Sequence, residues 1–318
     1  MSHYTIEHVS FLSVNQSNII SGVIYVPDSK PKGIVQISHG MCEYIGRYDR
    51  FMGYLADRGY IVAGHDHLGH GNSSDEAQYG YFGKEDGYQN LVEDLHRMTM
   101  LVKAKYGDLP YVLLGHSMGS FIARLYLSSY GDELDGAIIC GTGGPVAMSS
   151  MGIKLADQLC KKHSDFHRSQ KLEHLLFGSF NDRCKPERTE KDWLTRDNTI
   201  VDQYLQDPRC MFTFTAAGFR DLMTLSAKAN QSAWFEGLVK DLPILLIAGD
   251  MDPVGNYGKG VNKVYKRLKE VGLKDVSMIL YPGARHEILN EINYQEVYMD
   301  GEDWIRGLNV FLKSQSYQ

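Results

Sequence analysis

The chain has 318 residues, of which 43% are hydrophobic, and its formal net charge is −6. This length and composition are sufficient for a large buried core, whereas the acidic balance argues against a dedicated nucleic-acid-binding protein. The five cysteines include no C-x-x-C pair, so we expect free thiols in a reducing, cytoplasmic setting. We expect no signal peptide, because the N-terminus has no basic region followed by an apolar core, and no transmembrane segment, because no apolar run is long enough.

Short buried strands alternate with amphipathic helices along most of the chain. Residues 8–27 predict a β-hairpin, in which two alternating segments flank the polar turn Asn-Gln-Ser-Asn. Further apolar runs predict strands at 33–38, 60–66, 109–117, 135–142, 242–250 and 276–283. Helical periodicity predicts helices at 47–60, 87–106, 117–131, 261–272 and 303–314. This alternation is typical of an α/β protein with a mostly parallel central sheet flanked by helices.

The pattern of alternating strands and helices is interrupted between residues 144 and 235. This part is mostly helical and contains no strong buried strand. We therefore expect a core formed by residues 1–143 and 236–318, with a helical cap inserted at 144–235 above the carboxyl edge of the sheet.

A candidate nucleophile is Ser117, in the segment Gly-His-Ser-Met-Gly at 115–119. The motif G-x-S-x-G marks a nucleophile when it joins a strand to a helix, and this segment lies between a predicted strand and a predicted helix. The small flanking residues permit a very tight turn, which holds the serine hydroxyl above the sheet. The N-terminus of the following helix then faces any negative charge that develops.

A base and an orienting acid follow the serine in the expected order, each after a later strand. His286 is the only histidine beyond His174, so it is the candidate base. Asp250 and Asp252 both follow the strand at 242–250. We favour Asp252 as the acid and expect Asp250 to cap the loop. Ser117 would attack an acyl carbonyl while His286 takes its proton and Asp252 fixes the imidazole.

The oxyanion that forms in such a reaction requires two backbone donors. We expect the amide of Met118, directly after the nucleophile, to supply one. The other is expected from the early loop at residues 39–41, through the amide of Met41, while His39 holds the shape of that loop.

Two further groups of residues allow different interpretations. The run His65-Asp66-His67-Leu68-Gly69-His70 resembles a metal-binding segment, but Gly69 occupies the position that requires an aspartate, so we expect a structural turn. The apolar side chains in the insertion could line an acyl pocket or equally well pack inside the cap; the candidates for substrate contact are Phe212, Phe214, Phe219 and Met223.

Several segments together resemble the monoglyceride lipase and lysophospholipase group of α/β-hydrolases, which is related to serine aminopeptidase-type hydrolases. They are HGMCEYIGRY, GHDHLGHGNS, GHSMG, GDMDPVG and YPGARHEILNE, in the order of the family, from about His39 to Glu291. Tyr44 and Ile45 depart from the usual His-Ser, which leaves the contacts to the leaving group open.

The resemblance implies a capped α/β-hydrolase that uses neither a cofactor nor a metal. It implies Ser117, Asp252 and His286 as catalytic residues, with oxyanion amides at Met41 and Met118. The substrate would be a small-molecule acyl ester such as a monoacylglycerol or lysophospholipid. Contact with lipid surfaces would be transient and made through the cap. The alternatives are an aminopeptidase-type serine peptidase and a ligand-binding module with little turnover.

Overall fold

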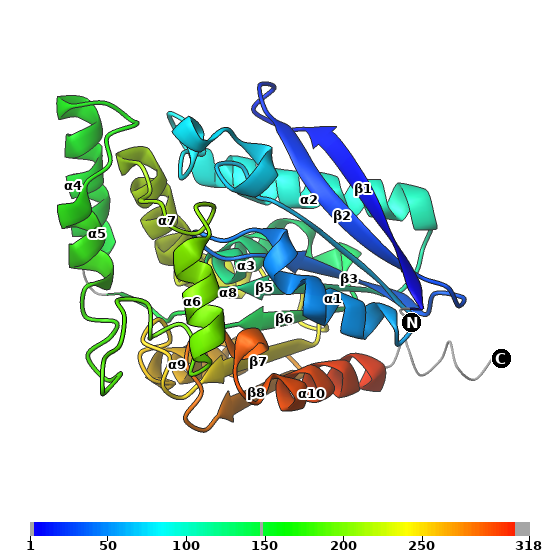
Figure 1. Ribbon diagram of the computed structural model, residues 1–318. Coiled ribbons are helices and arrows are strands. Elements are labelled where there is room, and N and C mark those ends of the chain that lie inside the picture. Colours follow the sequence, from blue (N-terminus) through cyan, green and yellow to red (C-terminus); the bar gives the residue numbers. More distant parts are fainter. Residues whose placement is uncertain (1–2, 147–148, 309–318) are drawn as a thin grey trace.

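The computed structural model describes residues 3–146 and 149–308, and its centre is an eight-stranded sheet (Figure 1). The strands are β1 (Tyr4–Leu12), β2 (Ile19–Pro27), β3 (Gly33–Ser38), β4 (Tyr60–His65), β5 (Tyr111–His116), β6 (Gly136–Cys140), β7 (Ile244–Gly249) and β8 (Val276–Tyr281). The helices are α1 (Asp49–Ala56), α2 (Gly87–Tyr106), α3 (Met118–Tyr130), α4 (Ser149–Lys162), α5 (Gln170–Phe177), α6 (Asn198–Gln206), α7 (Ala216–Ala229), α8 (Ser232–Glu236), α9 (Lys259–Glu270) and α10 (Tyr294–Gly307). The predicted part of the last helix beyond residue 308 lies outside the described residues.

The strand order is β1-β2-β4-β3-β5-β6-β7-β8. Strand β2 is antiparallel to both of its neighbours, and all later pairs are parallel. Parallel neighbours require a crossover connection, and the helices between the strands supply it. The predicted hairpin and the predicted, mostly parallel sheet are both confirmed.

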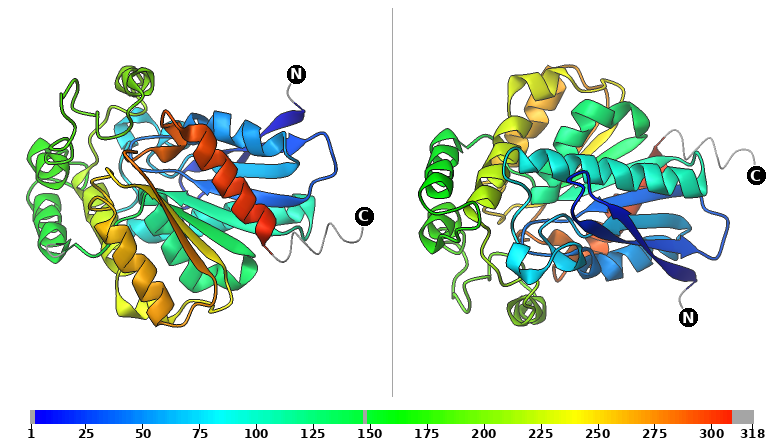
Figure 2. Two further views of the ribbon diagram at one scale, coloured as in Figure 1. Left: turned by 90° about the horizontal axis from the view of Figure 1, so that it is seen from below. Right: turned by 90° about the horizontal axis from the view of Figure 1, so that it is seen from above.

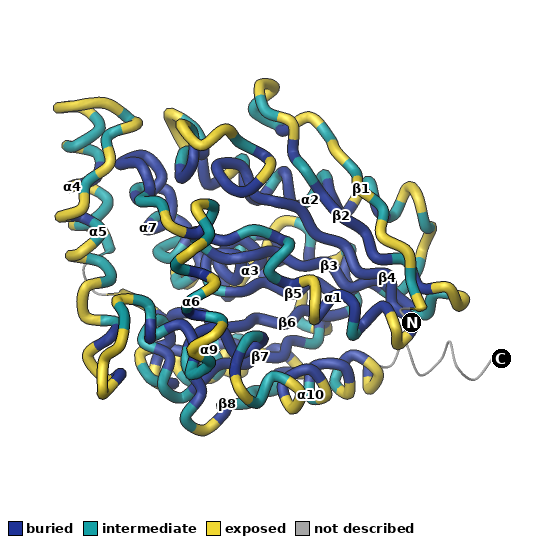
Figure 3. Tube along the Cα trace, viewed as in Figure 1, coloured by how far each residue is buried: buried dark blue, intermediate teal, exposed yellow. Residues whose placement is uncertain are grey.

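Helices cover both faces of the sheet, because the central strands are apolar on both sides (Figure 2). On β5, Val112 and Leu114 pack in a cluster that includes side chains of α1 and α10. Leu113, between them, belongs to the opposite cluster with α2, α3 and α9. The sheet is thus the middle of three layers, and its central strands are the most deeply buried part of the chain (Figure 3).

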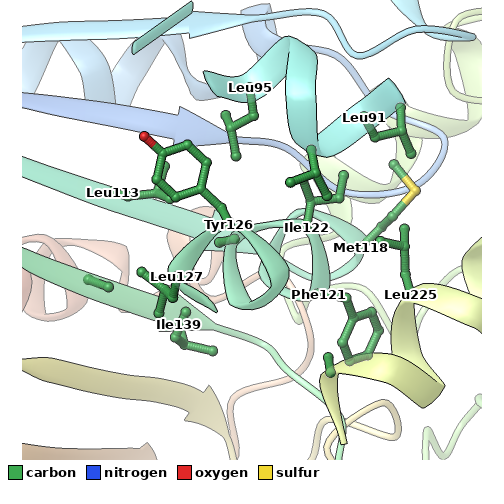
Figure 4. Packing of buried hydrophobic residues seen from close by; sticks show 14 of the residues in the cluster. Leu91, Leu95, Leu113, Met118, Phe121, Ile122, Tyr126, Leu127, Ile139 and Leu225 are labelled. Carbon is green, nitrogen blue, oxygen red and sulfur yellow. The ribbon is translucent and has the colours of Figure 1, made fainter. Parts of the chain in front are cut away.

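Helix α3 starts immediately after β5 and is held by apolar contacts along its length. Figure 4 shows Met118 and Ile122 beside Leu91 of α2, with Tyr126 reaching toward Leu95. Because this packing immobilises the first turn of α3, it also fixes the strand-to-helix turn that precedes it.

The residues between β6 and β7 lie at one end of the sheet. Helices α4, α5 and α6 project beside the core and are largely exposed (Figures 1 and 3). Helix α7 packs against α2 and α3 as well as against α4, so it joins the projecting helices to the core. The division into a core and a cap at 144–235 stays a prediction. None of the helices among the described residues is long and apolar enough to cross a membrane.

Candidate active site

Ser117 lies in the sharp turn between β5 and α3. Its φ of 54° and ψ of −119° are strained values for a residue with a side chain. A Cβ on Gly115 would lie 2.4 Å from the carbonyl oxygen of Gly119, and one on Gly119 would lie 2.1 Å from that of Ser38. Both flanking glycines are therefore required by close backbone packing, and they hold the serine at the carboxyl end of β5.

The structure brings Ser117, His286 and Asp252 together from three separate loops. The hydroxyl of Ser117 lies 2.8 Å from Nε2 of His286. On the other side of the imidazole, Nδ1 lies 3.0 Å from Oδ1 of Asp252. This second contact is at ion-pair distance but is poorly aligned for a hydrogen bond. Contacts of this kind often tighten only when substrate is bound.

The two aspartates after β7 have different surroundings. Asp252 is fully buried, and its Oδ1 also accepts a hydrogen bond of 2.8 Å from the amide of Val254. Asp250 instead accepts one of 2.7 Å from the amide of Gly283, in the loop after β8. The geometry therefore pairs Asp252, and not Asp250, with His286.

The loop after β3 lies against the turn that carries Ser117. A Cβ on Gly40 would be 3.0 Å from Cβ of Ser117. His39 shapes this loop: its Nε2 accepts a hydrogen bond from the amide of His67, so its Nδ1 donates to the carbonyl of Gly40. Met41 and Met118 both line the cavity beside Ser117. The two amides expected as oxyanion donors thus belong to residues next to the serine.

The predicted turn at 65–73 is held by local hydrogen bonds. Asp66 accepts from the amides of Ile45 (2.8 Å) and Asn72 (2.7 Å), and Nε2 of His70 accepts from the amide of Cys42 (3.3 Å). The side chains of Asp66 and His70 thus connect this segment to the residues that follow the loop at 39–41, which we call the oxyanion loop. Among the described residues, no group of histidine, cysteine and acidic side chains could hold a metal ion.

A buried network of charged residues lies next to the site and was not predicted from the sequence. Arg47 donates two hydrogen bonds of 2.7 Å to the carboxylate of Glu287 and one of 3.0 Å to Glu43. Glu43 also accepts from Tyr48 (2.8 Å) and from Nδ1 of His116 (3.2 Å). On the other side of this ring, Nε2 of His116 is 3.3 Å from the carbonyl of His286. The network thereby joins the oxyanion loop to the loop that carries the histidine.

Burial and charge pairing act in opposite directions on this network. Burial raises the pKa of Glu43, but the hydrogen bond and charge of His116 and the charge of Arg47 outweigh it and hold the pKa below its usual range. For His116, burial lowers the pKa, but Glu43 outweighs it and leaves the pKa above its ordinary value. Removal of either partner would leave an uncompensated buried charge.

A cavity of about 1160 Å³ opens above Ser117, between the loops of the sheet and the inserted helices. It is lined by many apolar side chains, including Phe121, Leu155, Leu176, Phe177 and Leu222. Of the side chains expected to contact substrate, Phe212 and Met223 line it. Phe214 and Phe219 do not. Both are fully buried, and the ring of Phe214 packs against Phe82, so the core interpretation holds for these two residues.

Tyr44, which departs from the family pattern, joins the core to the insertion. Its hydroxyl donates a hydrogen bond of 2.8 Å to Asp207 and lies 2.6 Å from a guanidinium nitrogen of Arg209, whose guanidinium also stacks on the tyrosine ring. The side chain is therefore engaged with the residues that follow α6.

The fold and the site together define the class of the protein. A mostly parallel eight-stranded sheet, a serine on a strained strand-to-helix turn, and an acid and a histidine after the last two strands are the arrangement of the α/β-hydrolase fold. The model of the family described as "Serine aminopeptidase, S33" matches residues 29–293, and the chain belongs to this family.

Known relatives extend the comparison over nearly the whole chain. A carboxyl esterase from Bacillus coagulans, solved with glycerol, is 34% identical and superposes with a TM-score of 0.90 over 96% of this chain and 99% of that one. The monoacylglycerol lipase of Mycolicibacterium smegmatis is 28% identical over 306 residues, which are 94% of this chain and 96% of the relative. The monoglyceride lipase of Rattus norvegicus is 27% identical over 269 residues, 84% of this chain and 79% of the relative. These findings confirm the predicted fold and the predicted resemblance.

Proposed function

We propose that the protein hydrolyses carboxylic esters with apolar acyl chains, such as monoacylglycerols or lysophospholipids, through an acyl-enzyme on Ser117. The observation that carries this proposal is the contact of Ser117 with His286, and of His286 with Asp252, at the floor of a large and mainly apolar cavity. Ester hydrolysis also agrees with the names of the relatives, which are esterases and lipases.

In the acylation step, the oxygen of Ser117 attacks the ester carbonyl carbon while Nε2 of His286 takes the hydroxyl proton. The buried carboxylate of Asp252 stabilises the imidazolium. The proton then passes to the alcohol oxygen as the carbon–oxygen bond breaks, and the alcohol leaves. In the second step, His286 takes a proton from water, which attacks the carbonyl carbon of the acyl-enzyme. The bond from this carbon to the oxygen of Ser117 then breaks, His286 returns the proton to that oxygen, and the fatty acid is released.

Two backbone amides would stabilise the negative charge on the carbonyl oxygen. Met118 is the first residue of α3, so its amide lies at the positive end of that helix. Met41 follows Gly40, whose backbone touches the turn of Ser117. Loss of one such donor costs about 2.7–4 kcal/mol of transition-state stabilisation in a serine hydrolase.

The size and lining of the cavity favour a long acyl chain over a short one. Its volume of about 1160 Å³ exceeds the usual range for small ligands, which is about 300–1000 Å³. Each methylene group of the acyl chain that moves from water to the apolar walls contributes about 0.8 kcal/mol to the binding free energy. The acyl chain would therefore supply the binding free energy, while the amides beside Ser117 would stabilise the transition state.

The charges near Ser117 favour an ester of an uncharged alcohol over a peptide with a free amino terminus. An aminopeptidase needs a carboxylate to hold the substrate ammonium group. Glu43 and Glu287, the carboxylates beside the oxyanion and histidine loops, are both neutralised by Arg47, and Glu43 also by His116. The family description refers to peptidases, but this pairing neutralises the carboxylates on the two loops beside the nucleophile; the other glutamates of the cavity, Glu173, Glu187 and Glu190, lie on the inserted segment.

Contact with a lipid surface and a cytoplasmic location complete the proposal. Five apolar side chains that line the cavity are exposed: Val146, Met151, Leu155, Leu175 and Met211. They favour transient contact of the insertion with lipid aggregates. The cysteines Cys42, Cys140, Cys160, Cys184 and Cys210 are all free, as the reducing cytoplasm would keep them.

The test is hydrolysis of 4-nitrophenyl esters with acyl chains of increasing length, by the wild type and by Ser117→Ala. We expect turnover that rises from acetate to medium or long chains and that collapses in the variant. A parallel series of aminoacyl 4-nitroanilides measures peptidase activity. Turnover of anilides but not of esters would replace the proposal with a peptidase, and the absence of any turnover would favour a binding module.

A further inference from the structure

The loop that carries His286 is bound to the inserted segment between α5 and α6. The amide of His286 donates to the carbonyl of Trp193 (3.3 Å), and the amide of Glu287 donates to that of Leu194 (2.6 Å). These two backbone bonds run from a loop of the sheet to a part of the chain about 90 residues earlier.

Side chains on both sides of the histidine strengthen this attachment. Arg285 donates to the carbonyls of Asp192 and Thr195. Arg196 forms an ion pair of 2.8 Å with Glu291, which is fully buried. The five residues 192–196, which we call the seating segment, are thus fixed to the residues before and after His286.

The imidazole of His286 also packs against two aromatic rings. Its centroid lies 4.8 Å from that of the His116 ring, with an interplanar angle of 42°. It lies 5.1 Å from that of the Trp193 indole, at an angle of 39°. Trp193 is itself held by Phe180, whose ring meets it edge-on at 4.9 Å, and by a backbone bond of 2.9 Å to the side chain of Asn181.

This packing is important because, of the two polar contacts of the ring, only that with Ser117 is a hydrogen bond. The contact from Nδ1 to Asp252 is close but poorly aligned, so it does not by itself set the rotation of the imidazole about its Cβ–Cγ bond. Packing against the rings of Trp193 and His116 restricts this rotation and keeps Nε2 directed at the hydroxyl of Ser117.

We propose that Trp193 is a positioning residue, by which the inserted segment, and not the sheet alone, holds the base of the reaction in its working orientation. The inference rests on the proposed function, because it assigns a role in the same chemistry. It also limits how the cavity opens, because the seating segment is bound to the core. A lid that moved as a whole would carry the histidine loop with it.

The test compares Trp193→Ala and Trp193→Phe with the wild type, with Phe166→Ala as a control. Phe166 is an exposed aromatic residue of the same insertion that stacks on Tyr81 and does not line the cavity. The substrate is 4-nitrophenyl acetate, whose acyl group is too short to depend on the apolar walls. Active sites are counted by titration with a small fluorophosphonate, so that kcat refers to folded, reactive enzyme.

We expect Trp193→Ala to lower kcat per titrated site by roughly 10- to 100-fold with little change in KM, as for a small displacement of a reacting group. The rate of phosphonylation at Ser117 should fall in parallel, Trp193→Phe should recover most of the loss, and Phe166→Ala should behave like the wild type. An unchanged kcat with a higher KM would make Trp193 only a wall of the cavity and overturn the inference. An equal loss in Phe166→Ala would overturn it too. Wild-type enzyme without esterase activity would instead refute the proposed function.

Discussion

Asp250 accepts a hydrogen bond of 2.7 Å from the backbone amide of Gly283, and this contact binds the first of the two neighbouring carboxylates after β7 to the loop after β8. Asp252, two residues later, is fully buried, with Oδ1 3.0 Å from Nδ1 of His286. Asp250 thus has a structural role, whereas Asp252 lies beside the base. The same substitution at each of the two positions distinguishes these roles.

We predict that Asp252→Asn lowers kcat by roughly three to four orders of magnitude, because an amide neither fixes the required tautomer of His286 nor stabilises its cation. Asp250→Asn should leave kcat within about threefold and lower the free energy of unfolding by about 1 kcal/mol, since it weakens only the bond to Gly283. Steady-state kinetics with a 4-nitrophenyl ester and urea unfolding check both statements. If Asp250→Asn had the larger effect on kcat, the assignment of the acid would be wrong.

Two glycine-to-alanine substitutions test how tightly the turn around Ser117 is packed. In Gly119→Ala the new methyl group would lie 2.1 Å from the carbonyl oxygen of Ser38, and no side-chain rotation relieves this overlap. We predict a loss of about 2–4 kcal/mol in unfolding free energy, together with loss of activity. Gly301 in α10 has nothing within 4 Å of a new Cβ, so Gly301→Ala should instead stabilise the protein by about 0.5–1 kcal/mol. Thermal unfolding of both variants would show whether the two changes have opposite signs.

A cluster of four buried histidines joins the oxyanion loop, through His39, to the turn that contains His65, His67 and His70. The ring centroids of His39 and His67 are 4.3 Å apart, those of His65 and His67 4.9 Å, and those of His39 and His70 5.2 Å. Burial lowers the pKa values of all four, to about 3 for His65 and His70. Within the described part of the chain, neither ring nitrogen of His65 has a hydrogen-bond partner.

This cluster predicts a loss of stability in acid. A folded-state pKa below the unfolded value of about 6.5 means that the unfolded chain binds more protons as the pH falls. The contribution of neutral His65 to the free energy of unfolding is therefore complete above about pH 6.5 and decreases toward pH 3. At pH 5 it is lower by about 2 kcal/mol. We predict that His65→Leu is about as stable as the wild type at pH 7 and more stable at pH 5. Urea unfolding at the two pH values measures the difference, and a parallel pH dependence of the two proteins would contradict it.

Most of the architecture could be predicted from the sequence, because the signals are local. Buried parallel strands appear as short apolar runs, and G-x-S-x-G between a strand and a helix indicates both the turn and Ser117. His286 could be identified because it is the only histidine in the last third of the chain, and chain order then limits the acid to two residues. Of these two, the sequence favours Asp252, and the structure places Oδ1 of Asp252 3.0 Å from Nδ1 of His286.

The rest of the site depends on long-range contacts that leave no periodic signal. The pairing of Arg47 with Glu287 joins residues 240 positions apart, and Trp193 reaches His286 from an insertion without regular secondary structure at that point. Phe214 and Phe219 could not be distinguished from the cavity residue Phe212, because apolar side chains at helical spacing serve a core and a pocket equally well. The structure separates these two roles: Phe219 is fully buried on α7, and Phe214, which precedes α7, is fully buried against Phe82.

The most direct test of the central claim is to locate the covalent intermediate. The protein is treated with a fluorophosphonate bearing a long alkyl chain, digested, and analysed by mass spectrometry, with His286→Ala treated in parallel. The proposed function predicts one phosphonyl group per chain, on the peptide that contains Ser117, and a much slower reaction in the variant. Modification of another residue, or labelling of Ser117 at the same rate without His286, would contradict the assignment of nucleophile and base.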